Sequence, residues 1–258
     1  MTNPAARILL ALDAAAHDAA ALGMSADIAR ELDADLTALI VQDVDLLRLA
    51  RLPFARELGA LTAWERPLDP ERMEATLRAQ ALRAEQRLIE ALQPRTPRLS
   101  LQFARGKIVR AAMAAAAGAD FVLFGAARQP RQHPPVSRQD SGRLRIALIV
   151  EDRPLPSRPL EVAIQLRRSL GAVLSVLVAG ADEEGFLRLR DEVISRCATG
   201  AAAARFRRVA GVEHRAVVQA ARAERADLVV LPSTASLAQE DSLRAVLGAI
   251  CCSLLWVR

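Results

Sequence analysis

The sequence predicts a doubly wound α/β fold that occurs twice in one chain of 258 residues. Three observations predict it. Short apolar runs alternate with longer segments of helical period, which is the order of strands and helices around a parallel sheet. The apolar runs are continuous, as in strands that are buried on both faces of a sheet. The second half of the chain also repeats the first half.

The repeat consists of four segments that keep their order. In chain order the pairs are "RILLALDAAAHD" (7–18) with "RIALIVEDRPLP" (145–156), "ADLTALIV" (34–41) with "GAVLSVLV" (171–178), "LSLQFARG" (99–106) with "ARFRRVAG" (204–211), and "ADFVLFGAARQ" (119–129) with "ADLVVLPSTAS" (226–236). The offset falls once, between the second and third pairs, because half one carries an insertion there. We interpret the pattern as a tandem duplication.

The elements follow from apolar runs and helical periodicity. Half one is expected to have strands at about 7–12, 35–41, 98–104 and 120–125, and helices near 15–32, 70–92 and 106–118. Half two is expected to have strands at about 144–150, 172–179, 203–209, 227–231 and 251–257, and helices near 158–170, 183–198, 212–225 and 240–249. In the helix at 70–92, for example, Leu77, Ala81 and Leu88 share one face.

Half one is expected to lack its last helix and strand. After Gly125 comes "AARQPRQHPPVSRQDSG", which has three prolines and no helical period and is typical of a linker. The missing strand is expected from half two or from a second subunit. The predicted domains are 1–127, with an insertion at about 42–70, and 143–258, joined by an Arg/Pro-rich linker at 128–142.

Composition excludes several classes of protein. The net charge of +5 accompanies mixed acidic and basic helices and only 3% aromatic residues, so a nucleic-acid face with stacking aromatics is not expected. The N-terminus has no signal-peptide pattern, and the uncharged stretch at 245–257 is too short to cross a bilayer. Three cysteines form no disulfide framework. We expect a cytoplasmic protein without a membrane contact.

The segments "RILLALD", "IARELDADLTALIV", "ARGKIVRAA", "GADFVLFGA" and "LGAICCSLLWVR" resemble the universal stress proteins, and the order of the halves is similar to the tandem type of that family. The resemblance implies a flavodoxin-like fold with five parallel strands and a homodimer. It also implies, for ATP-binding members, an aspartate after strand one, a residue at the end of strand two and a loop G-x2-G-x9-G-[ST] after strand four. Glycines allow a backbone to lie against phosphates.

Carried over to this chain, the family pattern gives Asp13, Val41 and Gly125 as nucleotide-binding residues of half one. In half two it gives Glu151 or Asp152 after strand one, and Gly248. The loops depart from the family pattern, since Arg128 replaces the second glycine of half one, and Pro232, Ala235 and Ala249 replace loop residues of half two. The resemblance therefore implies degenerate loops, with ATP or AMP and magnesium as the cofactor if a site is retained.

No other motif carries chemistry. The histidines (His17, His133 and His214) and the cysteines have no zinc-site spacing, and Ser233, Ser236 and Ser242 lack a nucleophile elbow. The insertion "QDVDLLRLARLPFARELGALTAWERPLDP" is strongly apolar and is expected to cap the first sheet or to form a dimer or partner surface.

We therefore expect a stress-response protein that acts through protein contacts and is not an enzyme. Two alternatives stay open. One is an adenine-nucleotide binder that uses half one, with slow ATP hydrolysis as a variant of this alternative. The other is an anion- or nucleic-acid-binding regulator that uses the arginines of residues 128–145.

Overall fold

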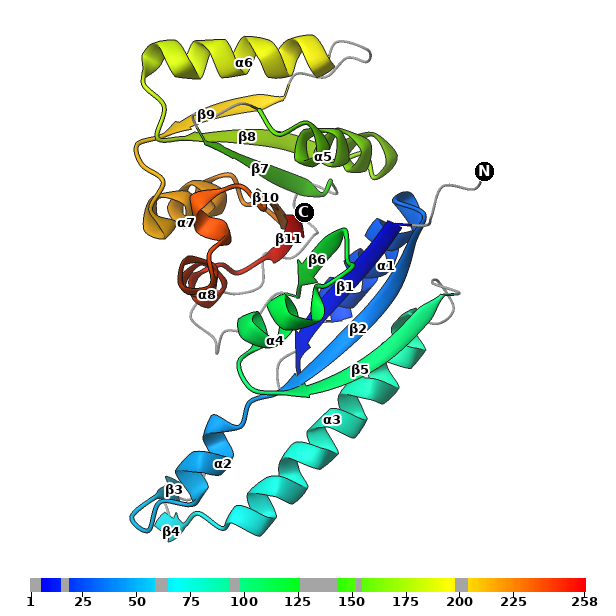
Figure 1. The fold of residues 1–258 in the computed structure, drawn as a ribbon, viewed down its shortest axis with the longest axis vertical. Coiled ribbons are helices and arrows are strands. Elements are labelled where there is room, and N and C mark those ends of the chain that lie inside the picture. The colour runs from blue at the N-terminus through cyan, green and yellow to red at the C-terminus, as the bar shows by residue number, and fades with distance from the viewer. Residues whose placement is uncertain are drawn as a thin grey trace.

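The computed structural model describes residues 6–14, 19–58, 65–92, 98–125, 143–151, 155–197 and 204–258 (Figure 1). Its elements are β1 (Ala6–Asp13), α1 (Ala19–Glu31), β2 (Ala34–Gln42), α2 (Asp45–Ala50), β3 (Arg56–Leu58), β4 (Glu65–Pro67), α3 (Pro70–Leu92), β5 (Leu99–Arg105), α4 (Ile108–Ala115), β6 (Phe121–Phe124), β7 (Arg145–Glu151), α5 (Ser157–Ser169), β8 (Val173–Ala179), α6 (Glu183–Cys197), β9 (Arg205–Val209), α7 (His214–Ala223), β10 (Leu228–Pro232), η2 (Ser236–Ala238), α8 (Glu240–Ala249) and β11 (Ser253–Val257). Every predicted strand is present, and each predicted helix matches an observed one. The predicted α/β fold is confirmed.

The strands of both halves form one sheet. Its order is β5-β2-β1-β6-β11-β10-β7-β8-β9, in which half one supplies the first four strands and half two the other five. All neighbours in this sheet are parallel except β6 and β11. The sequence predicts two units in tandem, and the structure joins them edge to edge in this sheet.

Strand β11 takes the place next to β6 that the last strand of half one was expected to leave empty. It pairs in parallel with β10, where Leu255 lies opposite Val230, and antiparallel with β6, where Leu255 lies opposite Leu123. The N–H of Ser253 donates to the carbonyl of Asp227 at 3.1 Å, and the N–H of Arg258 donates to the carbonyl of Asp120 at 3.1 Å. The missing strand of half one is thus replaced within the chain.

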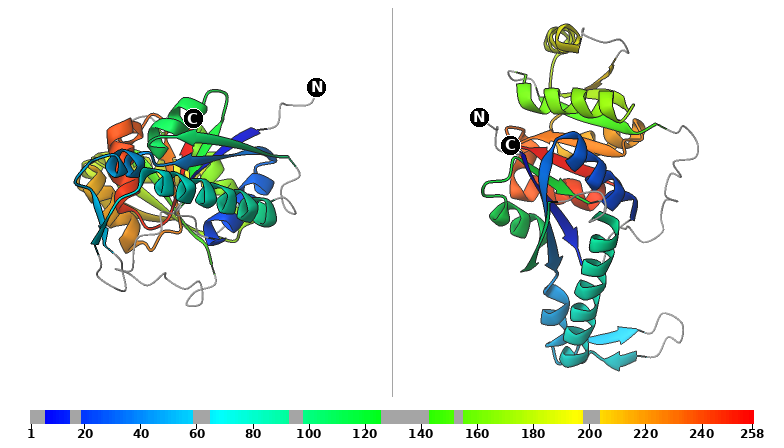
Figure 2. Two further views of the ribbon diagram at one scale, coloured as in Figure 1. Left: turned by 90° about the horizontal axis from the view of Figure 1, so that it is seen from below. Right: turned by 90° about the vertical axis from the view of Figure 1, so that its right-hand side faces the viewer.

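Helices cover both faces of the sheet (Figures 1 and 2). Alternate strand residues point to opposite faces, so Leu10 and Leu12 pack in the core under α1, α3, α5 and α6, whereas Leu9 and Ala11 pack in the core under α4, α7 and α8. Both cores extend across the β6–β11 junction and contain residues from both halves. Because the core is continuous, the residues of the junction are as buried as those in the interior of either half.

The repeated Ala-Asp pair has the same structural role twice. The carboxylate of Asp120 accepts a hydrogen bond from the backbone N–H of Arg7 at 2.9 Å, and the carboxylate of Asp227 accepts one from the N–H of Arg145 at 2.8 Å. Each aspartate therefore binds the start of the first strand in its half. The motif is structural in both places.

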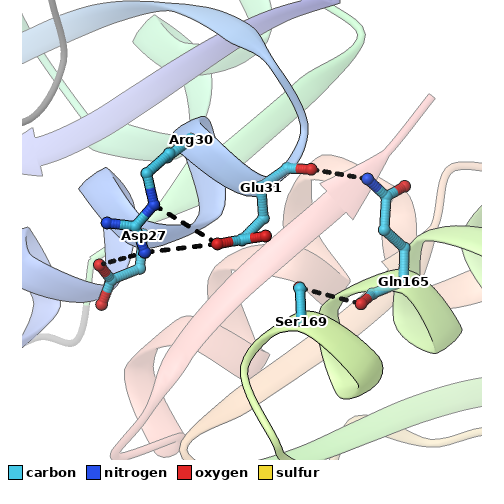
Figure 3. Close-up of polar contacts among 5 residues, drawn as sticks. All are labelled: Asp27, Arg30, Glu31, Gln165 and Ser169. Carbon is cyan, nitrogen blue, oxygen red and sulfur yellow. Dashed lines mark hydrogen bonds and ion pairs between the residues drawn. The ribbon is translucent and has the colours of Figure 1, made fainter.

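Polar contacts join the helices and strands of the two halves. Gln165 of α5 donates from its side-chain amide to the carbonyl of Glu31 at the end of α1, at 2.6 Å (Figure 3). Arg158 of α5 donates to the Asp120 carboxylate at 2.5 Å and lies over the ring of Phe121, 5.1 Å from its centroid. This arginine lowers the pKa of Asp120 by hydrogen bonding to its charged form.

The described part of the insertion forms an arm, which we define as α2, the β3–β4 hairpin and the first turns of α3. Figures 1 and 2 show that the arm extends away from the sheet beyond the end of β2. It does not lie over the strand ends, so the expected cap is wrong. Its apolar tip is solvent-exposed, with Phe54 76% exposed and Leu49 and Leu52 nearly half exposed.

Candidate functional site

The three residues predicted for half one meet at the carboxyl edge of its sheet. Asp13 ends β1 and lies in register with Val41 of β2, and the N–H of Ala14 donates to the carbonyl of Val41 at 2.9 Å. Gly125 follows β6, and its N–H donates to the carbonyl of Ala11 at 3.3 Å. Val41 is buried, and Asp13 is half-buried. Parallel strands place their carboxyl ends together, which explains why residues far apart in sequence converge here.

Lys107 adds a cation near this edge, and no sequence motif predicts its contacts. Its ammonium forms ion pairs with Asp43 at 3.2 Å and with Asp45. The hydrogen bond to Asp45 raises the pKa of Lys107, and the same contact lowers the pKa of Asp45. Lys107 is the only lysine in the chain, and that uniqueness was the one available signal. The pairs connect the β5–α4 turn to the base of the arm.

Gly106, next to Lys107, has a backbone that favours glycine. Its φ is +136°, and a Cβ added there would meet nothing within 4 Å. Its N–H donates to the carbonyl of Gln42 at 2.9 Å, which fixes the turn at the end of β5. Glycine is therefore favoured at position 106 by the backbone conformation, and not because a neighbouring atom leaves no room for a side chain.

Half two closes the corresponding edge with its own residues. Glu151 ends β7 and is 8% exposed. Its carboxylate accepts hydrogen bonds from the backbone N–H of Ser236 at 2.6 Å and from the Ser236 hydroxyl at 2.9 Å. In the same loop the N–H of Ser233 donates to the carbonyl of Val257 at 2.8 Å. The loop after β10 thus directs two of its N–H groups at protein oxygens.

The remaining predicted residues of half two do not join Glu151. Asp152 lies outside the described residues. Gly248 lies in the last turn of α8, where a Cβ would meet nothing within 4 Å. The linker at 128–142 and the residues His17 and His133 also lie outside the described part of the chain.

The described ranges indicate neither a metal site nor a reactive thiol at Cys252. No group of three or more His, Cys, Asp or Glu residues among them could hold a metal ion. Cys252 is buried, and burial raises the pKa of its thiol to about 12, so it is a poor nucleophile. Within the same ranges no helix is both long and apolar enough to span a bilayer.

The architecture has clear counterparts among solved structures. A universal stress protein from Archaeoglobus fulgidus DSM 4304 superposes with a TM-score of 0.55 over 97% of this chain and 96% of its own, at 12% sequence identity. The chain has the fold of the universal stress proteins. The alignment includes both halves, so this likeness extends to the whole nine-stranded arrangement and not to one half alone.

Two further universal stress proteins are similar over smaller parts. UspA from Lactobacillus plantarum matches 67% of this chain and 99% of its own with a TM-score of 0.36 and 17% identity. A universal stress protein in complex with cAMP matches 45% of this chain and 96% of its own with a TM-score of 0.38 and 22% identity. No protein-family model matches the sequence, and no curated protein matches it either.

Proposed function

We propose that this chain is a cytoplasmic universal-stress-type protein of the tandem class, which acts in a stress response by binding another protein and has no catalytic turnover. The observation that carries the proposal is the apolar tip of the arm. Leu49, Leu52 and Phe54 are exposed there together, at the end of a projection that has no counterpart among the described residues of half two. Exposed large apolar side chains that cluster are typical of a protein-binding surface.

The arm is ordered by contacts of its own. The N–H of Leu68 donates to the carbonyl of Ala55 at 3.0 Å, and Arg56 of β3 forms an ion pair with Glu65 of β4 at 3.3 Å. Lys107 binds the first turn of α2 to the β5–α4 turn. A preorganised surface loses little conformational entropy on binding, which favours recognition by a defined partner.

The closed loop of half two supports the same proposal. A phosphate needs free N–H donors, but the N–H of Ser236 already binds the Glu151 carboxylate. A carboxylate in that position would also repel a nucleotide phosphate. Half two is therefore proposed as a structural module that completes the sheet of half one.

Photo-crosslinking tests this proposal in cells that produce the protein. A photoreactive phenylalanine analogue replaces Phe54 in the arm or, as a matched control, the exposed Ile194 of α6. We expect one discrete adduct from position 54 and none from position 194. Excess unmodified chain should suppress the adduct, whereas excess chain with Phe54→Ser should not. Equal adducts from both positions, or hydrolysis of ATP above the buffer rate, would contradict the proposal.

A second candidate is adenine-nucleotide binding by half one. It is favoured by the convergence of Asp13, Val41 and Gly125 at one sheet edge. The test is calorimetric titration of the ligand-free protein with ATP and magnesium. Micromolar binding that Asp13→Ala abolishes and Gly248→Ala leaves intact would establish a half-one site. The absence of heat up to millimolar ATP would remove this candidate.

A further inference from the structure

The sheet has two outer strands, and they differ in how they are protected. β9 reads Arg205-Phe206-Arg207-Arg208-Val209, so three of its five side chains are cationic. β5 reads Leu99-Ser100-Leu101-Gln102-Phe103-Ala104-Arg105 and has one charge, at its last position. Natural proteins protect exposed sheet edges with charges, prolines or bulges. The β9 edge has such protection, whereas the β5 edge has almost none.

The outer backbone groups of β5 can be identified from its pairing with β2. The N–H of Leu36 donates to the carbonyl of Arg98, and the N–H of Gly106 donates to the carbonyl of Gln42. Even-numbered residues of β5 therefore direct their backbone groups toward β2. The N–H and C=O groups of Leu99, Leu101, Phe103 and Arg105 point outward, and no strand of the described residues pairs with them.

An apolar strip flanks this edge. Phe103 is 53% exposed and shares a face of β5 with Leu101, which packs against the core under α3. Arg105 forms an ion pair with Glu74 of α3 at 4.0 Å, which shows which side of α3 faces β5. Leu82 and Ile89 lie eight and fifteen residues after Glu74, on that side of the helix and further from the sheet. They are 60% and 36% exposed.

We propose that β5 is the surface on which a second copy of this chain docks, with the two β5 strands antiparallel about a two-fold axis. The outward backbone groups of one β5 can form hydrogen bonds only with outward backbone groups of the other. The two-fold axis must therefore pass between the two copies of one residue, and not between two residues that are adjacent in sequence. With the axis at Gln102, Leu99 lies opposite Arg105 and Leu101 opposite Phe103. This is the register in which all four outward residues are paired.

The register is self-complementary in chemistry as well as in hydrogen bonding. Leu101 and Phe103 form an apolar cross-strand pair twice, on the face that carries α3, and such pairs stabilise antiparallel strands. Each Arg105 faces a leucine, so no like charges meet. If β5 of one copy paired with β9 of the next, each copy would keep a free outer strand and the assembly could grow without end. A contact between two β5 strands uses the same surface on both copies and therefore closes as a dimer.

Sedimentation of the full chain tests the proposal. We expect a dimer of twice 27.9 kDa. Phe103→Pro removes an outward N–H without disturbing the bonds to β2, and should yield the monomer. Phe103→Arg, which keeps the backbone, should do the same. Arg208→Pro makes the matched change at the outward position of β9 and should leave the dimer intact. Circular dichroism of each variant verifies that it is folded.

Disulfide formation tests the register. With Cys197 and Cys251 replaced by serine, Gln102→Cys should give an intermolecular disulfide, because the two Cα atoms at the axis would be about 4.5 Å apart. Ser100→Cys should not, since those Cα atoms would be about 14 Å apart. A monomer at every concentration, a dimer that survives Phe103→Pro, or equal cross-linking at both positions would overturn the proposal. A monomer whose β5 instead accepts a foreign peptide strand would overturn it as well.

Discussion

Substitution of one buried leucine at the junction is expected to weaken both halves together. Leu255 of β11 is fully buried and lies between Leu123 of half one and Val230 of half two. Removing such a side chain costs about 2–5 kcal/mol through lost burial and a residual cavity. At about 2–4 °C per kcal/mol for a domain of this size, we expect the melting temperature of Leu255→Ala to fall by about 4–20 °C in a single transition.

Hydrogen exchange followed by mass spectrometry measures which strands Leu255→Ala destabilises. In Leu255→Ala the amides of β1 and of β7 should both exchange faster, since each lies one strand beyond a strand that β11 contacts. The control is Leu36→Ala in β2, equally buried but distant from the junction, which should affect half one more than half two. Unchanged exchange in β1 of Leu255→Ala would refute the reasoning, because half one would then be stable without β11.

Three further predictions concern single residues. Asp120→Asn should lower stability at neutral pH. The pKa of Asp120 is lowered in the folded state, so its charged form stabilises the fold above the ordinary pKa of 3.8, and this stability is lost as the pH falls through the folded pKa. In urea unfolding, the free energies of unfolding of the variant and the wild type should therefore converge in acid. Glu151→Ala should cost about 1–3 kcal/mol by leaving the Ser236 N–H without its acceptor, and an unchanged denaturation midpoint would contradict the closed loop. Gly106→Ala should destabilise the fold by about 1–3 kcal/mol through strain at positive φ. Gly248→Ala, inside α8, should instead stabilise the fold by about 0.5 kcal/mol. Equal changes in the melting temperature of the two variants would refute this reasoning.

The secondary structure was predictable because it depends on local patterns. Continuous apolar runs such as Phe121–Phe124 and Leu228–Pro232 indicate strands that are buried on both faces, and both are strands in the structure. The meeting of Asp13 and Val41 at one sheet edge was also predictable, since Asp13 ends one parallel strand and Val41 is next to the last residue of the neighbouring strand. The arm was not, because short apolar segments without a clear period do not reveal the direction in which they leave the sheet.

What the sequence by itself determined is the set of strands in the main sheet, the helices that cover it, and their order within each half. Only the tertiary structure decided that β11 belongs to both halves. An apolar strand such as Ser253–Val257 suits a partner on either edge, so its second partner depends on which edge is left open elsewhere in the chain. Glu151 and Ser236 are 85 residues apart, and their contact follows from the fold and not from spacing. The unprotected edge of β5 is likewise visible only once the strand order shows that β5 is outermost.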